Sequence, residues 1–204
     1  MMFRKVASDV LGLSDIGKII RPEDYDKVDS DDYVMHEEGE KIFFLIKSKA
    51  DEYCFTNYAL IHLDGTSAMS KKRMLKRFDY KNNRIHDVRL ETAGTMDMDV
   101  EIKFVMGENT YSVDVDKKQI SELKDLYKSL IKISSLQSEN AKLFQFAEKS
   151  LKTAADTVNL SAAASPPEMQ FRLINEYAFD WMKKAHENCL GKDFGKVFEM
   201  FINN

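Results

Sequence analysis

The amino-acid sequence predicts an α+β fold: a bent antiparallel sheet or small barrel of about seven strands, capped by one helix and followed by an all-helical C-terminal extension. Three observations predict it. Short apolar runs alternate with turn signals from residue 42 to residue 90. Strict apolar–polar alternation follows between Val100 and Val115. Apolar residues then recur at helical spacing from Asp116 onward.

The N-terminal part precedes the first predicted strand. Apolar residues recur at helical spacing there: Phe3, Val6, Val10 and Leu13. The spacing predicts a short amphipathic helix within residues 3–20. Residues 23–32 are strongly acidic, and we expect them to form a solvated connection or an edge.

Five short runs read as strands because they are rich in β-branched and aromatic residues and are bounded by turn signals. They are 42–46, 53–56, 58–63, 72–80 and 85–90. The Asp64-Gly65 dipeptide ends the third run.

Residues 100–106 and 111–115 alternate apolar and polar side chains and flank the turn at Gly107. A period of two with one apolar face predicts a half-buried antiparallel hairpin. A slip of one residue in either strand would place charges in the core, so the pattern also fixes the register.

The period becomes helical after this hairpin. Asp116 fits an N-cap, and Gln119 lies three residues on, where it can reach back to the cap. The apolar stripe of this helix is Ile120, Leu123, Tyr127, Leu130 and Ile131. We expect the helix to bury this stripe over the open end of the sheet.

The remaining residues predict helices. One helix runs through Leu143–Leu151, a hinge follows at 161–164, and Ser165-Pro166-Pro167 signals the next helix start, which Gly191 ends as a C-cap. A last short helix covers 194–202. We therefore expect one domain at residues 1–133 and a helical oligomerisation extension at 134–204.

Composition excludes several classes of protein. The chain has 30 Lys+Arg against 34 Asp+Glu, without the basic excess of a nucleic-acid-binding protein. No segment is long and apolar enough to span a bilayer. Cys54 and Cys189 lack a disulfide framework, and we expect two reduced, buried thiols in a cytoplasmic protein.

The sequence offers no recognisable catalytic, cofactor or metal site. The histidines His36, His62, His86 and His186 share no metal-ligand spacing. Residues 29–40 resemble a calcium loop in their acidic positions, but Val34 stands where the sharp turn requires glycine. We expect no cofactor, no metal and no enzyme, although a site assembled only in space needs no local motif.

A basic run is the most suggestive polar feature: Lys71, Lys72, Arg73, Lys76 and Arg77. Such a run can bind an anion or an acidic partner. The alternative is a solvated strand face balanced by nearby acids.

The helical extension carries large apolar side chains that need a covering surface: Phe171, Trp181, Phe194, Phe198 and Phe201. Short helices have little core of their own and are marginal in water. The cover is either the chain's own sheet domain or another copy. We favour another copy, because exposed apolar stripes of this size mark interfaces.

The strand region resembles the bacterial pleckstrin-homology (PH) domains. The residues that carry the resemblance are the run from Phe55 to Ile61, the Asp64-Gly65 turn, Glu91–Gly94, the strand beginning at Asp97 and the closing helix. Residues 20–133 are covered. The extension resembles the YvbH-like oligomerisation region. The resemblance implies a bent seven-stranded sheet capped by a helix, a homo-oligomer such as a ring, and no catalytic activity.

Three hypotheses follow. The first is a non-enzymatic, cytoplasmic PH-like scaffold that self-associates through its tail and presents a surface to an unidentified protein partner. The second is a peripheral membrane or anionic-ligand adaptor that uses residues 71–77 and the N-terminal helix. The third is an enzyme with a site between the two parts. We favour the first.

Overall fold

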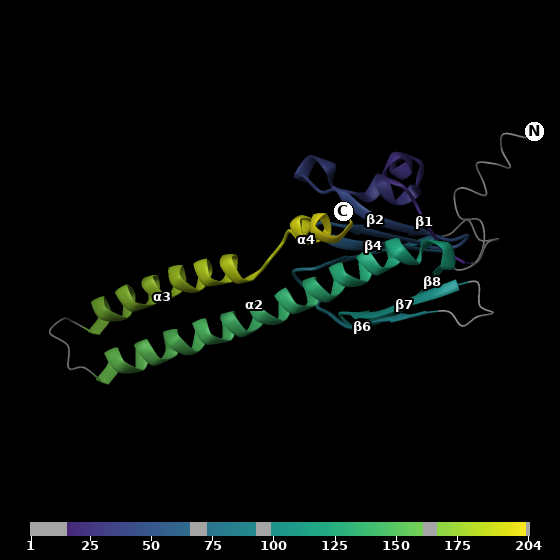
Figure 1. Ribbon diagram of the computed structural model, residues 1–204. Coiled ribbons are helices and arrows are strands. Elements are labelled where there is room, and N and C mark those ends of the chain that lie inside the picture. Colours follow the sequence, from purple (N-terminus) through teal and green to yellow (C-terminus); the bar gives the residue numbers. More distant parts are fainter. Residues whose placement is uncertain (1–15, 66–72, 93–98, 161–166, 203–204) are drawn as a thin grey trace, which may run out of the picture. The chain divides into compact units, whose positions relative to one another are not determined.

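The computed structural model describes residues 16–65, 73–92, 99–160 and 167–202 (Figure 1). The chain divides into two compact units. The sheet unit comprises Met1–Ser134 and Lys192–Asn204, and the hairpin unit comprises Ser135–Gly191. The last residues of the chain, which the sequence assigned to the helical extension, therefore belong to the sheet unit.

The sheet unit contains two antiparallel sheets, drawn as two layers in Figure 1. The five-stranded sheet has the order β1 (Lys18–Ile19), β2 (Ile42–Lys47), β3 (Glu52–Thr56), β4 (Ala59–Gly65) and β5 (Arg73–Asp79). The three-stranded sheet has the order β6 (Ile85–Glu91), β7 (Asp99–Met106) and β8 (Asn109–Asp116). The predicted fold class, with its strands before a helical region, is confirmed.

The β7–β8 hairpin has the register that its alternation predicts. Ile102 pairs with Val113 and Phe104 pairs with Tyr111. Val100, Ile102, Phe104 and Met106 of β7 are buried, while the residues between them are partly exposed. Phe104 and Tyr111 stack with ring centroids 4.9 Å apart, so the hairpin contributes one wall of the main core.

The two sheets are joined at Gly17. Its N–H donates to the Asp114 carbonyl at 2.8 Å, and its carbonyl accepts from the Asp116 N–H at 3.0 Å. A Cβ atom on Gly17 would lie 2.8 Å from the Asp114 carbonyl oxygen, so a side chain cannot fit without movement.

The predicted N-terminal helix is wrong over the residues that can be compared. Residues 3–15 of it lie outside the described part, and residues 18–19 form β1. Ile19 pairs with Ile46 of β2, so tertiary pairing takes up the backbone groups that a helix would have satisfied internally.

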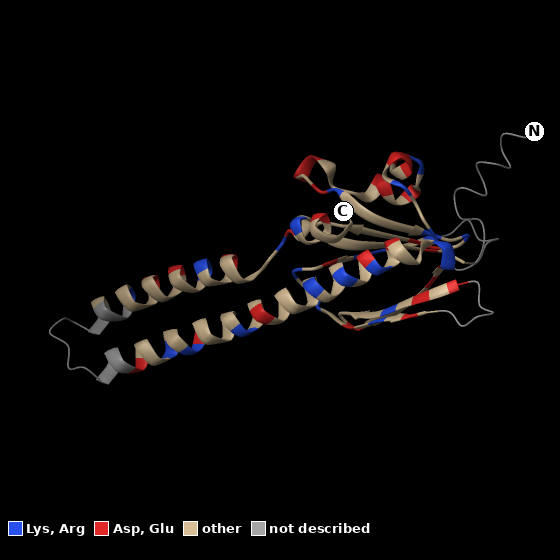
Figure 2. Cartoon of the chain, in the orientation of Figure 1, with Lys and Arg blue, Asp and Glu red and all other residues tan. Residues whose placement is uncertain are grey.

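The acidic segment between β1 and β2 is ordered as three 3-10 helices: η1 (Pro22–Lys27), η2 (Asp29–Tyr33) and η3 (His36–Glu38). We call residues 22–38 the η segment. It is rich in acidic residues, coloured red in Figure 2, and none of them is buried. Val28 and Val34 are buried against Leu45 and Ile61 of the five-stranded sheet. The segment is therefore a cover for that sheet, not a solvated connection.

Helix α2 (Ile120–Leu160) follows the short 3-10 turn η4 (Lys117–Gln119). The Lys118 N–H donates to the Asp116 carboxylate at 2.9 Å, which confirms the cap. Gln119 does not complete a capping box. Its side chain instead donates to the Ile19 carbonyl and accepts from the Ile19 N–H, at 3.0 and 2.8 Å. This pair ties the start of α2 to β1.

The buried face of α2 differs in part from the predicted stripe. Leu123, Leu126, Leu130 and Ile133 are fully buried, whereas Ile131 is 43% exposed. The helix then continues without a break into the hairpin unit, in place of two separate helices.

The final helix, α4 (Gly195–Ile202), packs on β2. Phe198 is fully buried and stacks on Phe43 with centroids 5.4 Å apart. Phe194 meets the edge of Tyr80 at 5.7 Å. Phe194 and Phe198 thus fill the core of their own sheet unit, which corrects their assignment to an interface with another copy. The two rings are buried there because they pack against the apolar surface of Phe43 and Tyr80.

The hairpin unit consists of the second part of α2 and α3 (Pro167–Cys189). The rings of Phe144 on α2 and His186 on α3 meet with centroids 5.9 Å apart. Among the described helices, none has an apolar stretch that would reach across a lipid bilayer.

Replacement of Phe198 by alanine tests the docking of α4. We expect Phe198→Ala to lower the free energy of unfolding of the sheet unit by about 3–5 kcal/mol, because a buried ring is lost and a cavity remains. Urea denaturation followed by circular dichroism measures this.

Met200→Ala on the same helix is the matched control. Met200 is 54% exposed, so its truncation should change stability by less than about 0.5 kcal/mol. Equal effects of the two substitutions would contradict the packing of α4 described above.

Candidate functional site

The described members of the basic run on β5 are held in ion pairs. Arg73 contacts Asp29 and Glu52, and Lys76 lies 2.7 Å from Asp64. Lys71 and Lys72 lie outside the described residues. The arginine pairs join β5 to the η segment and to the end of β3. In the described residues, the run therefore links neighbouring elements of the sheet unit through ion pairs.

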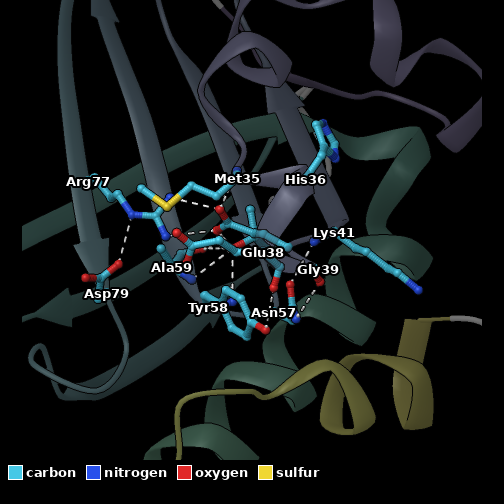
Figure 3. Close-up of polar contacts among 12 residues, drawn as sticks. Met35, His36, Glu38, Gly39, Lys41, Asn57, Tyr58, Ala59, Arg77 and Asp79 are labelled. Carbon is cyan, nitrogen blue, oxygen red and sulfur yellow. Dashed lines mark hydrogen bonds and ion pairs between the residues drawn. The ribbon is translucent and has the colours of Figure 1, made fainter.

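Arg77, the last member of the run, is joined to Asp79 by a dashed line in Figure 3 and also pairs with the buried carboxylate of Glu40. Glu40 is 1% exposed and accepts four hydrogen bonds. Arg77 donates two of them through Nη1 and Nη2 at 3.0 and 3.1 Å, and the Met35 N–H donates at 2.8 Å. The Thr56 hydroxyl donates the fourth at 2.5 Å. Every acceptor position of the carboxylate is therefore used.

The electrostatics of Glu40 follow from this geometry. Burial by itself raises the pKa of Glu40, but the hydrogen bonds from Arg77 and Thr56 outweigh it and lower the pKa below its ordinary value. The Arg77 Nε–H donates to Asp79 at 2.9 Å, so the guanidinium is held between two carboxylates. The pKa of Arg77 is raised, because those carboxylates outweigh its own burial.

Asn57 connects the same region to two further segments. The Lys41 N–H donates to its side-chain oxygen at 2.8 Å, and the Phe194 N–H donates to its backbone carbonyl at 2.9 Å. Asn57, in the β3–β4 turn, thereby holds both the residue before β2 and the approach to α4. From the sequence, Glu40 was considered only as the last position of a rejected calcium loop, and Asn57 only as part of the Phe55–Ile61 run that resembles the PH domains.

A cavity of about 410 Å³ opens beside Arg77. It belongs to the sheet unit and is lined by Met35, Glu38, Tyr58, Arg77, Asp79, Lys81, Lys192 and Asp193. Two of these groups are already engaged with each other, since Arg77 and Asp79 form an ion pair. The Asp193 carboxylate accepts from the Gly195 N–H at 2.7 Å and so caps α4.

The proposed interface residues of the tail are divided between the two units. Phe194 and Phe198 are buried in the sheet unit, and Phe201 is partly buried on α4. Trp181 is partly buried on α3, and the side chain of Phe171 lies outside the described residues. The candidate interface set is therefore divided between the two units, and the core of the sheet unit takes up Phe194 and Phe198.

Other large apolar side chains are exposed on the hairpin unit. They are Leu143, Phe146, Met169, Leu173, Tyr177 and Phe179. The sequence placed Leu143 on the apolar stripe of its helix, whereas the other five were not singled out because they lie beside the stripe. Their exposed fractions run from 51% for Met169 to 71% for Tyr177, so they form the largest uncovered apolar feature of this unit.

His62 and the two cysteines are the remaining residues considered for chemistry. His62 stacks on Tyr53 with centroids 4.4 Å apart and lies 3.2 Å from Asp51. Cys54 is buried, which raises the pKa of its thiol, and Cys189 is half-buried; both are free. Among the described residues, no cluster of His, Cys, Asp and Glu has the arrangement of a metal site.

The Glu40–Arg77 pair predicts a pH-dependent stability. The folded state lowers the pKa of Glu40 below its ordinary value of 4.5. The Glu40–Arg77 pair therefore contributes its full stabilisation above about pH 5.5, and this stabilisation is lost as the pH falls through the lowered pKa. Glu40→Gln should lower the free energy of unfolding by about 3–5 kcal/mol at pH 7, since Arg77 is left without its main charged partner. The difference from the natural chain should shrink below about pH 4.

Urea unfolding between about pH 3.5 and pH 7 at fixed protein concentration measures this effect. Glu37→Gln, at an exposed position of η3, is the control and should leave the pH profile unchanged. A constant difference between Glu40→Gln and the natural chain across that range would contradict the assignment.

Comparison with known proteins shows which families the two parts of the chain match. Residues 10–134 match the family described as bacterial PH domain, and residues 145–204 match the YvbH-like oligomerisation region. The uncharacterized protein YvbH of Bacillus subtilis strain 168 is 54% identical over 204 residues, which is 100% of both chains.

A solved structure of a PH-domain-containing bacterial protein from Exiguobacterium sibiricum 255-15 is 48% identical. It covers 93% of this chain and 100% of its own, with a TM-score of 0.86. The chain thus belongs to the bacterial PH domain family and carries a YvbH-like oligomerisation region after its PH domain.

Proposed function

We propose that this chain is a non-enzymatic interaction module whose PH-like sheet unit is multiplied by self-association of the hairpin unit. The observation that carries the proposal is that the described apolar side chains of the hairpin unit are exposed or only partly buried. The name of the matched C-terminal family supports the same direction.

The hairpin unit has almost no core of its own. Among its residues with described side chains, Gln137 is the only buried one, at 9% exposure. A pair of helices gains its stability mainly from packed apolar faces, since isolated helices are marginal in water. A pair without a buried core needs a further surface to pack against.

The partly buried residues of both helices follow the three-four spacing of a packing seam. On α2 they include Phe144, Ala147 and Leu151, and on α3 they include Ile174, Ala178 and Trp181. A seam that stays only half-buried within one hairpin would become fully covered if a second hairpin packed against it. Two hairpins together would make a bundle of four helices.

The exposed residues lie on the flanks of this seam. Leu173 and Tyr177 are four residues apart on α3, at 55% and 71% exposure, and Leu143 on α2 is 55% exposed. Burying apolar surface stabilises an interface by about 25 cal/mol per Å². Another copy supplies a complementary flank without any further partner.

The sheet unit supports a binding role in preference to catalysis. Its convergent polar groups hold one another: Glu40 and Asp79 hold Arg77, and Asp193 caps α4. Among the described members of the basic run, each cation also has an acidic partner, so the alternative of an anionic-ligand or membrane adaptor gains no support there.

Charge substitution on the flank tests the self-association. The natural chain should have a solution mass that is a multiple of 23.6 kDa, and the double variant Leu173→Glu, Tyr177→Glu should fall toward a single chain. Introduced carboxylates would lose hydration in the interface and repel their copies. Multi-angle light scattering at several concentrations measures the mass.

The matched control is Lys183→Glu, an exposed position on the polar face of α3. It should keep the mass of the natural chain. Circular dichroism and the unfolding midpoint of the sheet unit should be unchanged in both variants. A natural chain that is monomeric at about 100 μM would refute self-association.

A further inference from the structure

We propose that the η segment is a detachable strap, which acid releases from the outer face of the five-stranded sheet while the rest of the sheet unit stays folded. Figure 1 shows the η helices on the side of β2 and β4 that faces away from the three-stranded sheet. Two buried carboxylates, those of Glu40 and Glu52, hold the segment there. Its detachment does not depend on self-association of the hairpin unit.

The η segment buries few side chains. Of residues 22–38, only Val28, Ser30 and Val34 are buried, and Tyr25 is partly buried. The two valines belong to a small apolar cluster, whose other members are Ile20, Leu45, Cys54 and Ile61. A segment with so little buried apolar surface opens at a lower free energy than the core of its domain.

Two backbone N–H groups of the segment end on buried carboxylates. The Ser30 N–H donates to Glu52 at 2.9 Å, and the Met35 N–H donates to Glu40 at 2.8 Å. Both carboxylates are 1% exposed, and both lie outside the segment, since Glu52 begins β3 and Glu40 precedes β2. The N-cap side chains of η1, η2 and η3 accept no hydrogen bond from these helices. The sheet thus supplies acceptors that the short helices lack.

Cations on the strands hold the two carboxylates in their charged form. The Lys47 ammonium lies 2.5 Å from Glu52, and the Arg77 guanidinium lies 3.0 Å from Glu40. Burial raises the pKa of both carboxyls, but the hydrogen bonds from these cations and from the N–H donors outweigh it. Both pKa values therefore lie below the ordinary value of 4.5.

The direction of these pKa changes makes the attachment sensitive to acid. A carboxyl whose pKa is lowered by folding stabilises the folded arrangement above its unfolded pKa, and this stabilisation is lost as the pH falls through the lowered pKa. Attachment is therefore complete above about pH 5.5 and weakens below 4.5. Protonation of Glu40 and Glu52 removes the charge from their ion pairs with Arg77 and Lys47.

The other charged and titratable groups near the two carboxylates do not reverse this direction. Arg73 lies 3.6 Å from Glu52 and also contacts Asp29 of η2, so it adds a second link that needs carboxylates. Asp79 shares Arg77 with Glu40. The thiol of Cys54 and the hydroxyl of Tyr80 stay neutral in acid, because burial raises the pKa of each.

Repulsion among the exposed acids of the segment acts in the opposite sense. Residues 22–38 carry eight Asp or Glu and one Lys, so acid relieves their mutual repulsion. None of these acids is buried, and water and salt screen the repulsion between exposed charges. The loss of the two buried attachments is the larger effect, because buried ion pairs are screened much less.

The main core does not need the η segment. Side chains alternate along β3, so Cys54 faces the segment while Phe55 faces the three-stranded sheet, where its ring lies 6.1 Å from that of Phe104. Helix α2 closes the same core with Leu123 and Leu126, which are fully buried. These contacts involve no residue of the segment, so its detachment leaves them in place.

Cys54 reports on detachment, because its side chain is fully buried in the cluster that the segment covers. The full chain with Cys189→Ser keeps this thiol as its one reporter. In that background, Glu52→Gln and Glu40→Gln imitate the protonated carboxyls at pH 7. Each should speed the reaction of Cys54 with 4,4′-dithiodipyridine at least about tenfold, which corresponds to about 1.4 kcal/mol.

Glu37→Gln is the matched control, since it is the same substitution at an exposed position of η3. It should leave the labelling rate unchanged within about twofold. An acceleration by Glu37→Gln equal to that by Glu52→Gln, or no acceleration by either buried substitution, would overturn the attachment through Glu40 and Glu52.

A core substitution separates detachment from global unfolding. Leu126→Ala removes a fully buried side chain of α2 and lowers the stability of the whole sheet unit, but it should leave the labelling rate of Cys54 unchanged. The labelling rate of Glu52→Gln should also depend on urea much less steeply than unfolding does. Labelling that follows global stability in these two tests would mean that the reagent reaches Cys54 by global unfolding, and the strap would be refuted.

A pH series with both glutamates in place tests the release by acid, and it remains decisive if the glutamine variants do not fold. The labelling rate of Cys54 is divided by that of glutathione with the same reagent at each pH. This ratio should rise at least about tenfold between about pH 6 and pH 3.5, before circular dichroism reports loss of the sheet unit. A constant ratio down to that loss would refute the proposal. A monomeric natural chain with the expected labelling would contradict only the self-association.

Discussion

The sheet unit depends on the compensation of one buried charge, the Glu40 carboxylate. An unpaired carboxylate inside a protein costs several kcal/mol, so its partners are structurally obligatory. Thr56 ends β3, Arg77 lies in β5 and Met35 belongs to the η segment. Satisfying the carboxylate therefore sets the relative positions of these parts. The cavity beside Arg77 is a consequence of that arrangement.

The two units satisfy their apolar residues in different ways. The sheet unit closes its core within one chain: α2 contributes Leu123 and Leu130, and α4 packs Phe198 against Phe43 of β2. The hairpin unit leaves Leu173 and Tyr177 exposed. This difference is the basis for the proposal that the hairpin unit mediates association. A weak site on the sheet unit would gain effective affinity from several linked copies.

Sequence reasoning succeeded where a local period reports directly on burial. The alternation of β7 and β8 and the cap at Asp116 are present as predicted. It failed where a distant partner decides. Helical spacing near Val10 suggested a helix, but residues 18–19 pair with β2. The basic run suggested an anion site, which stays a prediction; its Arg77 pairs with a carboxylate distant in sequence, that of Glu40, which no local pattern indicates.

The sequence by itself determined the fold class, the strand positions and the presence of a helical region, because periods of two and 3.6 residues encode which face of an element is buried. Only the tertiary structure decided which apolar residues stay uncovered and which charged groups meet. Phe194 and Phe198 are buried by their own chain, while Lys81 and Lys192 converge on one cavity. Both outcomes depend on contacts between residues far apart in sequence, which a local pattern does not contain.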